Sequence, residues 1–106
     1  MPIISKQQHM LTLINTFTVA PERQEELVNL LIEATRSLMK RVPGFVSANI
    51  HRGLDGRHVV DYAQWRTRDN FEAMLRDPEA QAHMQKIAQM AEAEPLLYEV
   101  VEHIPE

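Results

Sequence analysis

The sequence predicts an α+β fold, in which helices cover one face of a four-stranded antiparallel sheet with strand order 4-1-3-2. Two observations lead to this prediction. Apolar residues recur with the period of strands and then of helices, in the order β-α-β-β-α-α-β, and turn residues separate the segments. A split β-α-β arrangement is the usual solution for that order. The 106 residues are enough for one hydrophobic core and too few for two.

The first predicted strand covers residues 10–19, where alternation places Leu13, Asn15 and Phe17 on one face. Asn15 interrupts an otherwise apolar face. Its amide either bonds a neighbouring backbone group or points at a ligand, and both interpretations stay open. Residues 1–9 carry no apolar run of signal-peptide length and are predicted to be a disordered lead, followed by a single domain over residues 10–106.

The first predicted helix starts at Pro21 and ends near Arg41. Proline and several glutamates suit its first turn, and its apolar positions recur at three and four residues. We therefore expect one stripe of this helix to cover the sheet. The Pro43-Gly44 pair ends the helix and leads into the next strand.

The second and third strands, residues 45–52 and 57–66, are predicted to form a hairpin around the turn at residues 53–56. Strict alternation places His51 on one face of the second strand, and Ala48 and Ile50 on the other. His51 then faces either a pocket or solvent.

The third strand places Asp61 and Trp65, the only tryptophan, on one face. A charge on a buried face is costly unless it is paired or used. Either Asp61 reaches water at the rim of the sheet while Trp65 is core, or the two side chains line a pocket. The predicted strand order makes the first and third strands neighbours, so the face of Asn15 lies beside theirs.

Two short helices follow, one capped by Thr67 and one by Asp77. Phe71 and Met74 belong to the apolar stripe of the first helix, and the second carries its own apolar stripe.

His83 and Met84 lie at the edge of the second helix's stripe. His83 is either a core-boundary residue or a ligand or proton carrier. Pro95 is predicted to end this helix, and Leu96 to Ile104 to form the last strand.

The sheet face away from the helices is predicted to be apolar. An apolar sheet open to water is unfavourable in a monomer, so a second copy is expected to cover it and make a homodimer. The residues expected there are Ile14, Ala48, Ile50, Val60 and Tyr62.

Composition excludes several functions. The absence of cysteine rules out disulfides and thiolate metal sites and fits a reducing cytoplasm, where we expect the protein to reside. The sequence contains no run of eighteen apolar residues, so no membrane-spanning helix is predicted. A net charge of -4 with scattered basic residues argues against nucleic-acid binding. Histidine spacing predicts no metal site, and neither a phosphate-binding glycine loop nor a hydrolase elbow occurs.

Several motifs resemble the antibiotic biosynthesis monooxygenase family. They are the runs Val-Pro-Gly-Phe-Val-Ser-Ala at 42–48 and Val-Val-Asp-Tyr-Ala-Gln-Trp at 59–65, the Asp55-Gly56 turn, and Asp77-Pro78. The resemblance extends from about Leu11 to Ile104. It implies a dimeric α+β barrel, in which two ferredoxin-like halves pack with their sheets face to face.

The resemblance also implies an activity. Members of this family that oxygenate anthrones and hydroquinones need no flavin, haem or metal, and several carry an asparagine in the first strand and an asparagine four residues before a tryptophan. Asn15 and Trp65 match that pattern, whereas Asp61 replaces the second asparagine. An ionised carboxylate accepts hydrogen bonds but cannot donate them.

We therefore expect a cofactor-independent monooxygenase that oxidises a small aromatic phenol, anthrone or hydroquinone with dioxygen. The expected catalytic residues are Asn15, Asp61 and Trp65. Phe71 stands where some family members have a tyrosine. The residues expected to bind the substrate are Leu13, Phe17, His51, Phe71, Met74, His83 and Met84.

Two alternatives stay open at this point. The haem-degrading branch of the same superfamily pairs an asparagine and a tryptophan on strands with a helical histidine that binds iron, and Asn15, Trp65 and His83 occupy similar positions. A small-molecule-binding dimer without catalytic activity is the other alternative.

Overall fold

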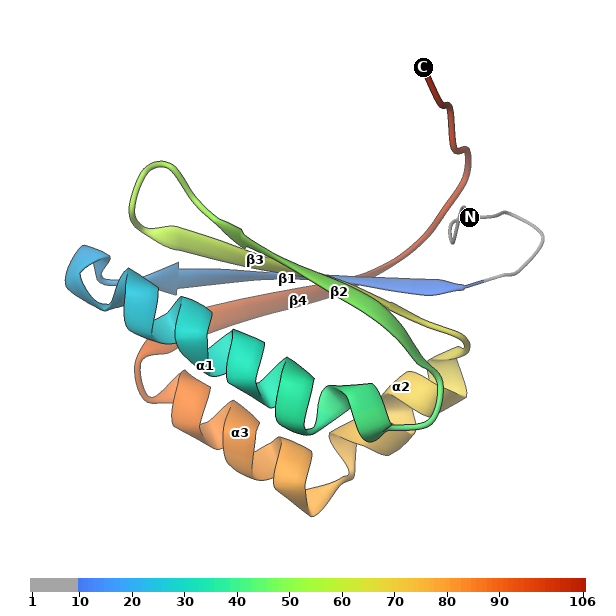
Figure 1. The fold of residues 1–106 in the computed structure, drawn as a ribbon, viewed down its shortest axis with the longest axis horizontal. Helices are drawn as coiled ribbons and strands as arrows, with labels where there is room; N and C mark the ends of the chain where they lie inside the picture. Colours follow the sequence, from blue (N-terminus) through green and yellow to red (C-terminus); the bar gives the residue numbers. More distant parts are fainter. Residues whose placement is uncertain (1–9) are drawn as a thin grey trace.

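The computed structural model contains an antiparallel sheet in the order β2-β3-β1-β4, which confirms the predicted strand order. The strands are β1 (Leu11–Val19), β2 (Phe45–Arg52), β3 (His58–Trp65) and β4 (Ala91–Glu99). Helices α1 (Gln24–Ser37), α2 (Arg68–Leu75) and α3 (Pro78–Ala88) lie together on one face of the sheet (Figure 1). The structure describes residues 10–106, so the lead predicted at residues 1–9 lies outside the described part.

Strand β1 lies in the interior of the sheet, between β3 and β4. Its register places Asn15 directly opposite Asp61 on β3 and opposite Pro95 on β4. Residues directly opposite each other in an antiparallel pair project on the same face. The prediction that the Asn15 face lies beside the Asp61 face is therefore confirmed.

The helix predicted from Pro21 to Arg41 is divided into three pieces. Short 3₁₀ helices, η2 (Pro21–Arg23) and η3 (Met39–Arg41), flank α1 at its two ends. Gly44 follows with a φ of +87°, and a Cβ there would lie 2.2 Å from Cγ of Asn70. Only glycine allows this close approach of the turn to the start of α2.

Helices α2 and α3 begin at the predicted caps. Oγ1 of Thr67 accepts a hydrogen bond from the Asn70 amide at 3.0 Å. Oδ1 of Asp77 accepts from the amides of Glu79 at 2.8 Å and Ala80 at 3.3 Å. These bonds satisfy N–H groups that have no partner within the first turn of a helix.

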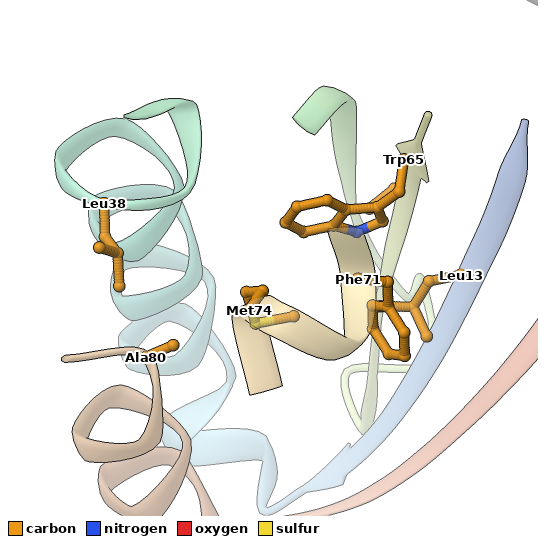
Figure 2. Packing of buried hydrophobic residues seen from close by; sticks show 7 residues of the cluster. Leu13, Leu38, Trp65, Phe71, Met74 and Ala80 are labelled. Atoms are coloured by element: carbon orange, nitrogen blue, oxygen red, sulfur yellow. The ribbon is translucent and has the colours of Figure 1, made fainter. Parts of the chain in front are cut away.

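The core between sheet and helices consists of two clusters. One surrounds Trp65 and includes Phe71 and Met74 (Figure 2). The other is centred on Val59 and Leu27, which are both fully buried. Together the clusters join the sheet to all three helices.

The prediction for the faces of β2 was wrong. The pairing of β2 with β3 shifts between Phe45 and Ser47, as a β-bulge does, so the alternation resumes one residue out of phase. Ala48 consequently pairs with Ala63, and Ile50 with Asp61, and both pack on the helix side instead of the open face.

The prediction for the last strand was also wrong. Strand β4 begins at Ala91, after a two-residue turn that follows α3, contains Pro95, and ends at Glu99, while residues 100–106 form neither helix nor strand. Because β4 is an edge strand, a residue without an N–H is tolerated there if its nitrogen faces the unpaired edge. Pro95 therefore does not end a helix.

Candidate functional site

A cavity of about 450 Å³ lies between the sheet and the helices. Its sheet wall includes Leu13, Asn15, Phe17 and Asp61, and its helical wall includes residues of α1, α2 and α3. Most of the lining is apolar, which suits a hydrophobic ligand. The cavity opens to solvent, because several lining residues are exposed: Leu75 and Met84, at 38 % and 36 %, and also Ala88, Ala93 and Pro95.

Asn15 and Asp61 form the polar part of the sheet wall. Oδ1 of each side chain is buried, and neither finds a hydrogen-bond partner among the described residues. A buried polar atom left without a partner costs free energy, so two such atoms side by side are unusual. Since both side chains line the cavity, a bound molecule with hydrogen-bond donors can satisfy them.

The environment of Asp61 also changes its acidity. Burial disfavours the charged form and raises the pKa of the Asp61 carboxyl from its ordinary value of 3.8 to about 6. The carboxylate is then ionised at neutral pH and is a stronger base than an exposed aspartate. Such a group is suited to accept a proton from a bound acid.

Thr35 on α1 and His83 on α3 are the polar side chains of the helical wall. The Thr35 hydroxyl donates to the Leu31 carbonyl at 2.8 Å, so it can only accept a further hydrogen bond. His83 is half-buried. Within the described residues, no hydrogen bond or ion pair engages its imidazole.

Most side chains predicted to bind the substrate line the cavity, but His51 does not. The bulge in β2 leaves His51 opposite Val60, on the sheet face away from the helices, and it is exposed. Its predicted place in the pocket is therefore wrong. The predicted residues that do line the cavity are Leu13, Phe17, Phe71, Met74, His83 and Met84.

Trp65 lies beside the cavity and does not line it. The indole is 2 % exposed and packs edge-on against Phe45 and Phe71, with ring centroids 5.6 and 6.1 Å away. Figure 2 shows Phe71 and Met74 next to the indole. Nε1 of Trp65 is buried without a partner among the described residues. The indole contacts Phe71, which lines the cavity, but is not itself part of the lining.

Sequence reasoning missed a large part of the wall. The apolar stripes of the helices contained some of its residues, and the predicted start of the last strand at Leu96 concealed Ala93 and Pro95. The missed lining residues are Leu31, Ala34, Thr35 and Met39 from the α1 region, Leu75, Ile87 and Ala88 from α2 and α3, and Ala91, Ala93, Pro95 and Leu97 from β4.

Two further properties concern residues 10–106. Their histidines, aspartates and glutamates form no group of three that could hold a metal ion. None of their helices has the length and apolar character needed to cross a membrane.

The fold and the cavity define the class of this protein. It is a ferredoxin-like α+β domain with an apolar small-molecule cavity, and an amide and a carboxylate are set into the sheet wall of that cavity. The family model described as antibiotic biosynthesis monooxygenase matches residues 10–86. The chain belongs to this family and is a monooxygenase.

Individual relatives agree with this assignment. The chain is 43 % identical over 100 residues to the tetracenomycin-F1 monooxygenase of Streptomyces glaucescens, and the match covers 94 % of this chain and 89 % of that protein. SnoaB of Streptomyces nogalater, whose structure is described as that of a cofactor-independent oxygenase, is 28 % identical with a TM-score of 0.78. That match covers 92 % of this chain and 99 % of SnoaB.

A further solved structure supports the fold. A monooxygenase of Streptomyces coelicolor, in complex with nanaomycin D, is 24 % identical, with a TM-score of 0.86 and coverage of 94 % and 95 % of the two chains. The description of SnoaB agrees with the prediction that the chain needs no cofactor.

Proposed function

We propose that this enzyme oxidises a polycyclic phenol, anthrone or hydroquinone of the polyketide type to a quinone, with dioxygen and without a cofactor. The observation that carries the proposal is the pair of buried, unpartnered oxygens of Asn15 and Asp61 on the wall of an apolar cavity. The identity with a tetracenomycin-F1 monooxygenase supports an aromatic polyketide as the substrate class.

In the proposed mechanism Asp61 is the general base. It accepts a proton from the bound phenol or from the activated CH₂ of an anthrone, and the pKa of about 6 supports this role near neutral pH. The Asn15 amide then donates a hydrogen bond to the oxygen on which the negative charge develops. The amide can do so because it can present either its oxygen or its NH₂ to the ligand.

Dioxygen is the oxidant of the electron-rich anion. One electron passes to dioxygen, and the resulting radical pair combines to form a carbon–oxygen bond. Loss of water then leaves a carbonyl at the former CH₂. The CH₂ carbon supplies all four electrons that reduce dioxygen, one oxygen atom enters the product as the carbonyl, and the other leaves as water with the two hydrogens of the former CH₂.

Trp65 has a positioning role in this proposal. Its indole packs against Phe71, which lines the cavity, and therefore holds the aromatic wall against which a planar substrate would stack.

The test is aerobic conversion of an anthrone by the purified protein in the presence of a chelator and with no added flavin, haem or metal. We expect quinone formation with one equivalent of dioxygen consumed, and ¹⁸O₂ should label the new carbonyl. Activity that appears only when haem is added, together with a histidine-type Soret band lost in His83→Ala, would instead favour the haem alternative.

We also propose that the enzyme is a homodimer in which a second copy covers the open face of the sheet. An apolar row crosses that face, because Tyr62, Ile14 and Leu96 lie opposite one another on β3, β1 and β4. Leu96 and the neighbouring Tyr98 are 52 % and 44 % exposed. Isologous contact of two such faces would remove these side chains from water.

Light scattering at micromolar concentration should therefore give the mass of a dimer, and Leu96→Glu should shift the protein toward the monomer. Leu54→Glu is the matched control, because Leu54 is fully exposed at the tip of the β2–β3 turn, away from the row. A wild-type protein that stays monomeric would contradict the proposal.

A further inference from the structure

The polar groups of the cavity differ between its two walls. Asn15 and Asp61 on the sheet present oxygen atoms without partners, and Asp61 is negatively charged when ionised. On the helical wall, His83 presents an imidazole that has no partner among the described residues. Within the described part of the chain, His83 is the one basic side chain that lines the cavity.

His83 is also partly solvated. It is half-buried, and the next residue of α3, Met84, lines the cavity and is 36 % exposed. By contrast, the two unpartnered oxygens of the sheet wall are fully buried. The cavity therefore offers buried hydrogen-bond acceptors on its sheet wall and a half-buried hydrogen-bond donor on its helical wall.

An anionic substituent of a ligand fits only one of these walls. Against the sheet wall it would meet the Asp61 carboxylate and lose its hydration, and both effects are unfavourable. Against the helical wall it can accept a hydrogen bond from the half-buried His83, since an imidazole has an N–H to donate in either protonation state. Thr35, whose hydroxyl proton is engaged by Leu31, cannot replace His83 as a donor.

We propose that His83 is a specificity-determining residue that binds a carboxylate on the substrate, on the helical wall of the cavity. The preferred substrates are then aromatic acids, and their orientation is defined: the acid lies against the helical wall at His83 and the ring to be oxidised lies against Asn15 and Asp61 on the sheet wall. This proposal rests on the proposed function for the identity of the reacting end, but its binding test does not require turnover.

The experiment compares two unreactive ligands, anthraquinone-2-carboxylate and the neutral anthraquinone-2-carboxamide, by calorimetric titration of the intact protein. We expect the wild type to bind the carboxylate about tenfold more tightly, the effect typical of one charge-assisted hydrogen bond near solvent. His83→Phe keeps an aromatic ring but has no N–H to donate, so it should bring the ratio of the two dissociation constants close to one and leave the carboxamide affinity unchanged.

His51→Phe is the matched control, because His51 lies on the opposite face of the sheet and its replacement should leave the ratio unchanged. Retained carboxamide binding shows that His83→Phe is folded. A wild-type ratio near one, a ratio that His83→Phe does not change, or failure of both ligands to bind would overturn the proposal. If the ratio behaves as expected but no anthrone is oxidised, the proposed function fails and the carboxylate site stands.

Discussion

Asn15→Ala and Asp61→Ala should each lower kcat for anthrone oxidation by about a hundredfold or more, the usual loss when a preorganised polar group of an active site is removed. The two side chains lie directly opposite each other on β1 and β3, and each has a buried oxygen without a partner among the described residues. Asn15→Ala removes the proposed donor to the developing oxyanion, and Asp61→Ala removes the proposed base. Both variants should keep their fold, because these side chains face a cavity and not the packed core.

Asp61→Asn separates the two possible roles of this position. An amide can form hydrogen bonds but cannot act as a base near neutral pH, so we expect this variant to be about as inactive as Asp61→Ala. Steady-state kinetics with one anthrone, and with the exposed His51→Ala as control, measure the effect. Retained activity in Asp61→Asn would mean that the position serves as a hydrogen-bonding group and that the base assignment is wrong.

The same substitution should stabilise the protein at neutral pH. Folding raises the pKa of Asp61 from 3.8 to about 6, so ionised Asp61 opposes folding. Above pH 6 the ionised carboxyl lowers the free energy of unfolding of the wild type by its full amount, about 3 kcal/mol for a pKa shift of this size. As the pH falls from about 6 to about 4 the carboxyl takes up a proton in the folded state and the cost disappears. Asp61→Asn never carries this charge, so its advantage should be largest above pH 6 and vanish below pH 4.

Urea unfolding of both proteins at several pH values between 4 and 8 measures this difference in the free energy of unfolding. Asp69→Asn is a suitable control, because Asp69 is an exposed carboxyl in the first turn of α2. A stability difference that does not vary with pH would mean that the Asp61 carboxyl is not strongly desolvated. An enzyme that gains stability and loses activity through one substitution would illustrate the cost of keeping a charged base in an apolar cavity.

Local patterns in the sequence were enough to predict the part of the site that lies on the neighbouring strands β1 and β3. The period-two alternation of β1 and β3 requires no tertiary information, and it placed Asn15 on the face shared by Asp61. The topology expected for the element order then made β1 and β3 neighbours, which the register confirms. The caps Thr67 and Asp77 were equally predictable, because capping bonds join residues two or three positions apart.

Only the tertiary structure decided two other features: the faces of β2 after its shift in register, and the place of Pro95 within β4. A bulge adds one residue to β2 and reverses the faces after it, which moves His51 away from the cavity and Ile50 to the helix side. Pro95 stands within a strand because β4 is at the edge of the sheet.

The tertiary structure also decided which residues line the cavity and which belong to the core. Trp65 has the alternation of a pocket residue, yet its indole packs against Phe71 from α2, is buried and does not line the cavity, so the tryptophan is core. Thr35 of α1 and Ala93 of β4 are far apart in sequence but line one cavity, because helix and strand are stacked across it. Alternation specifies the face on which a side chain projects, whereas the packing of the opposite layer determines whether that side chain meets a ligand or another side chain.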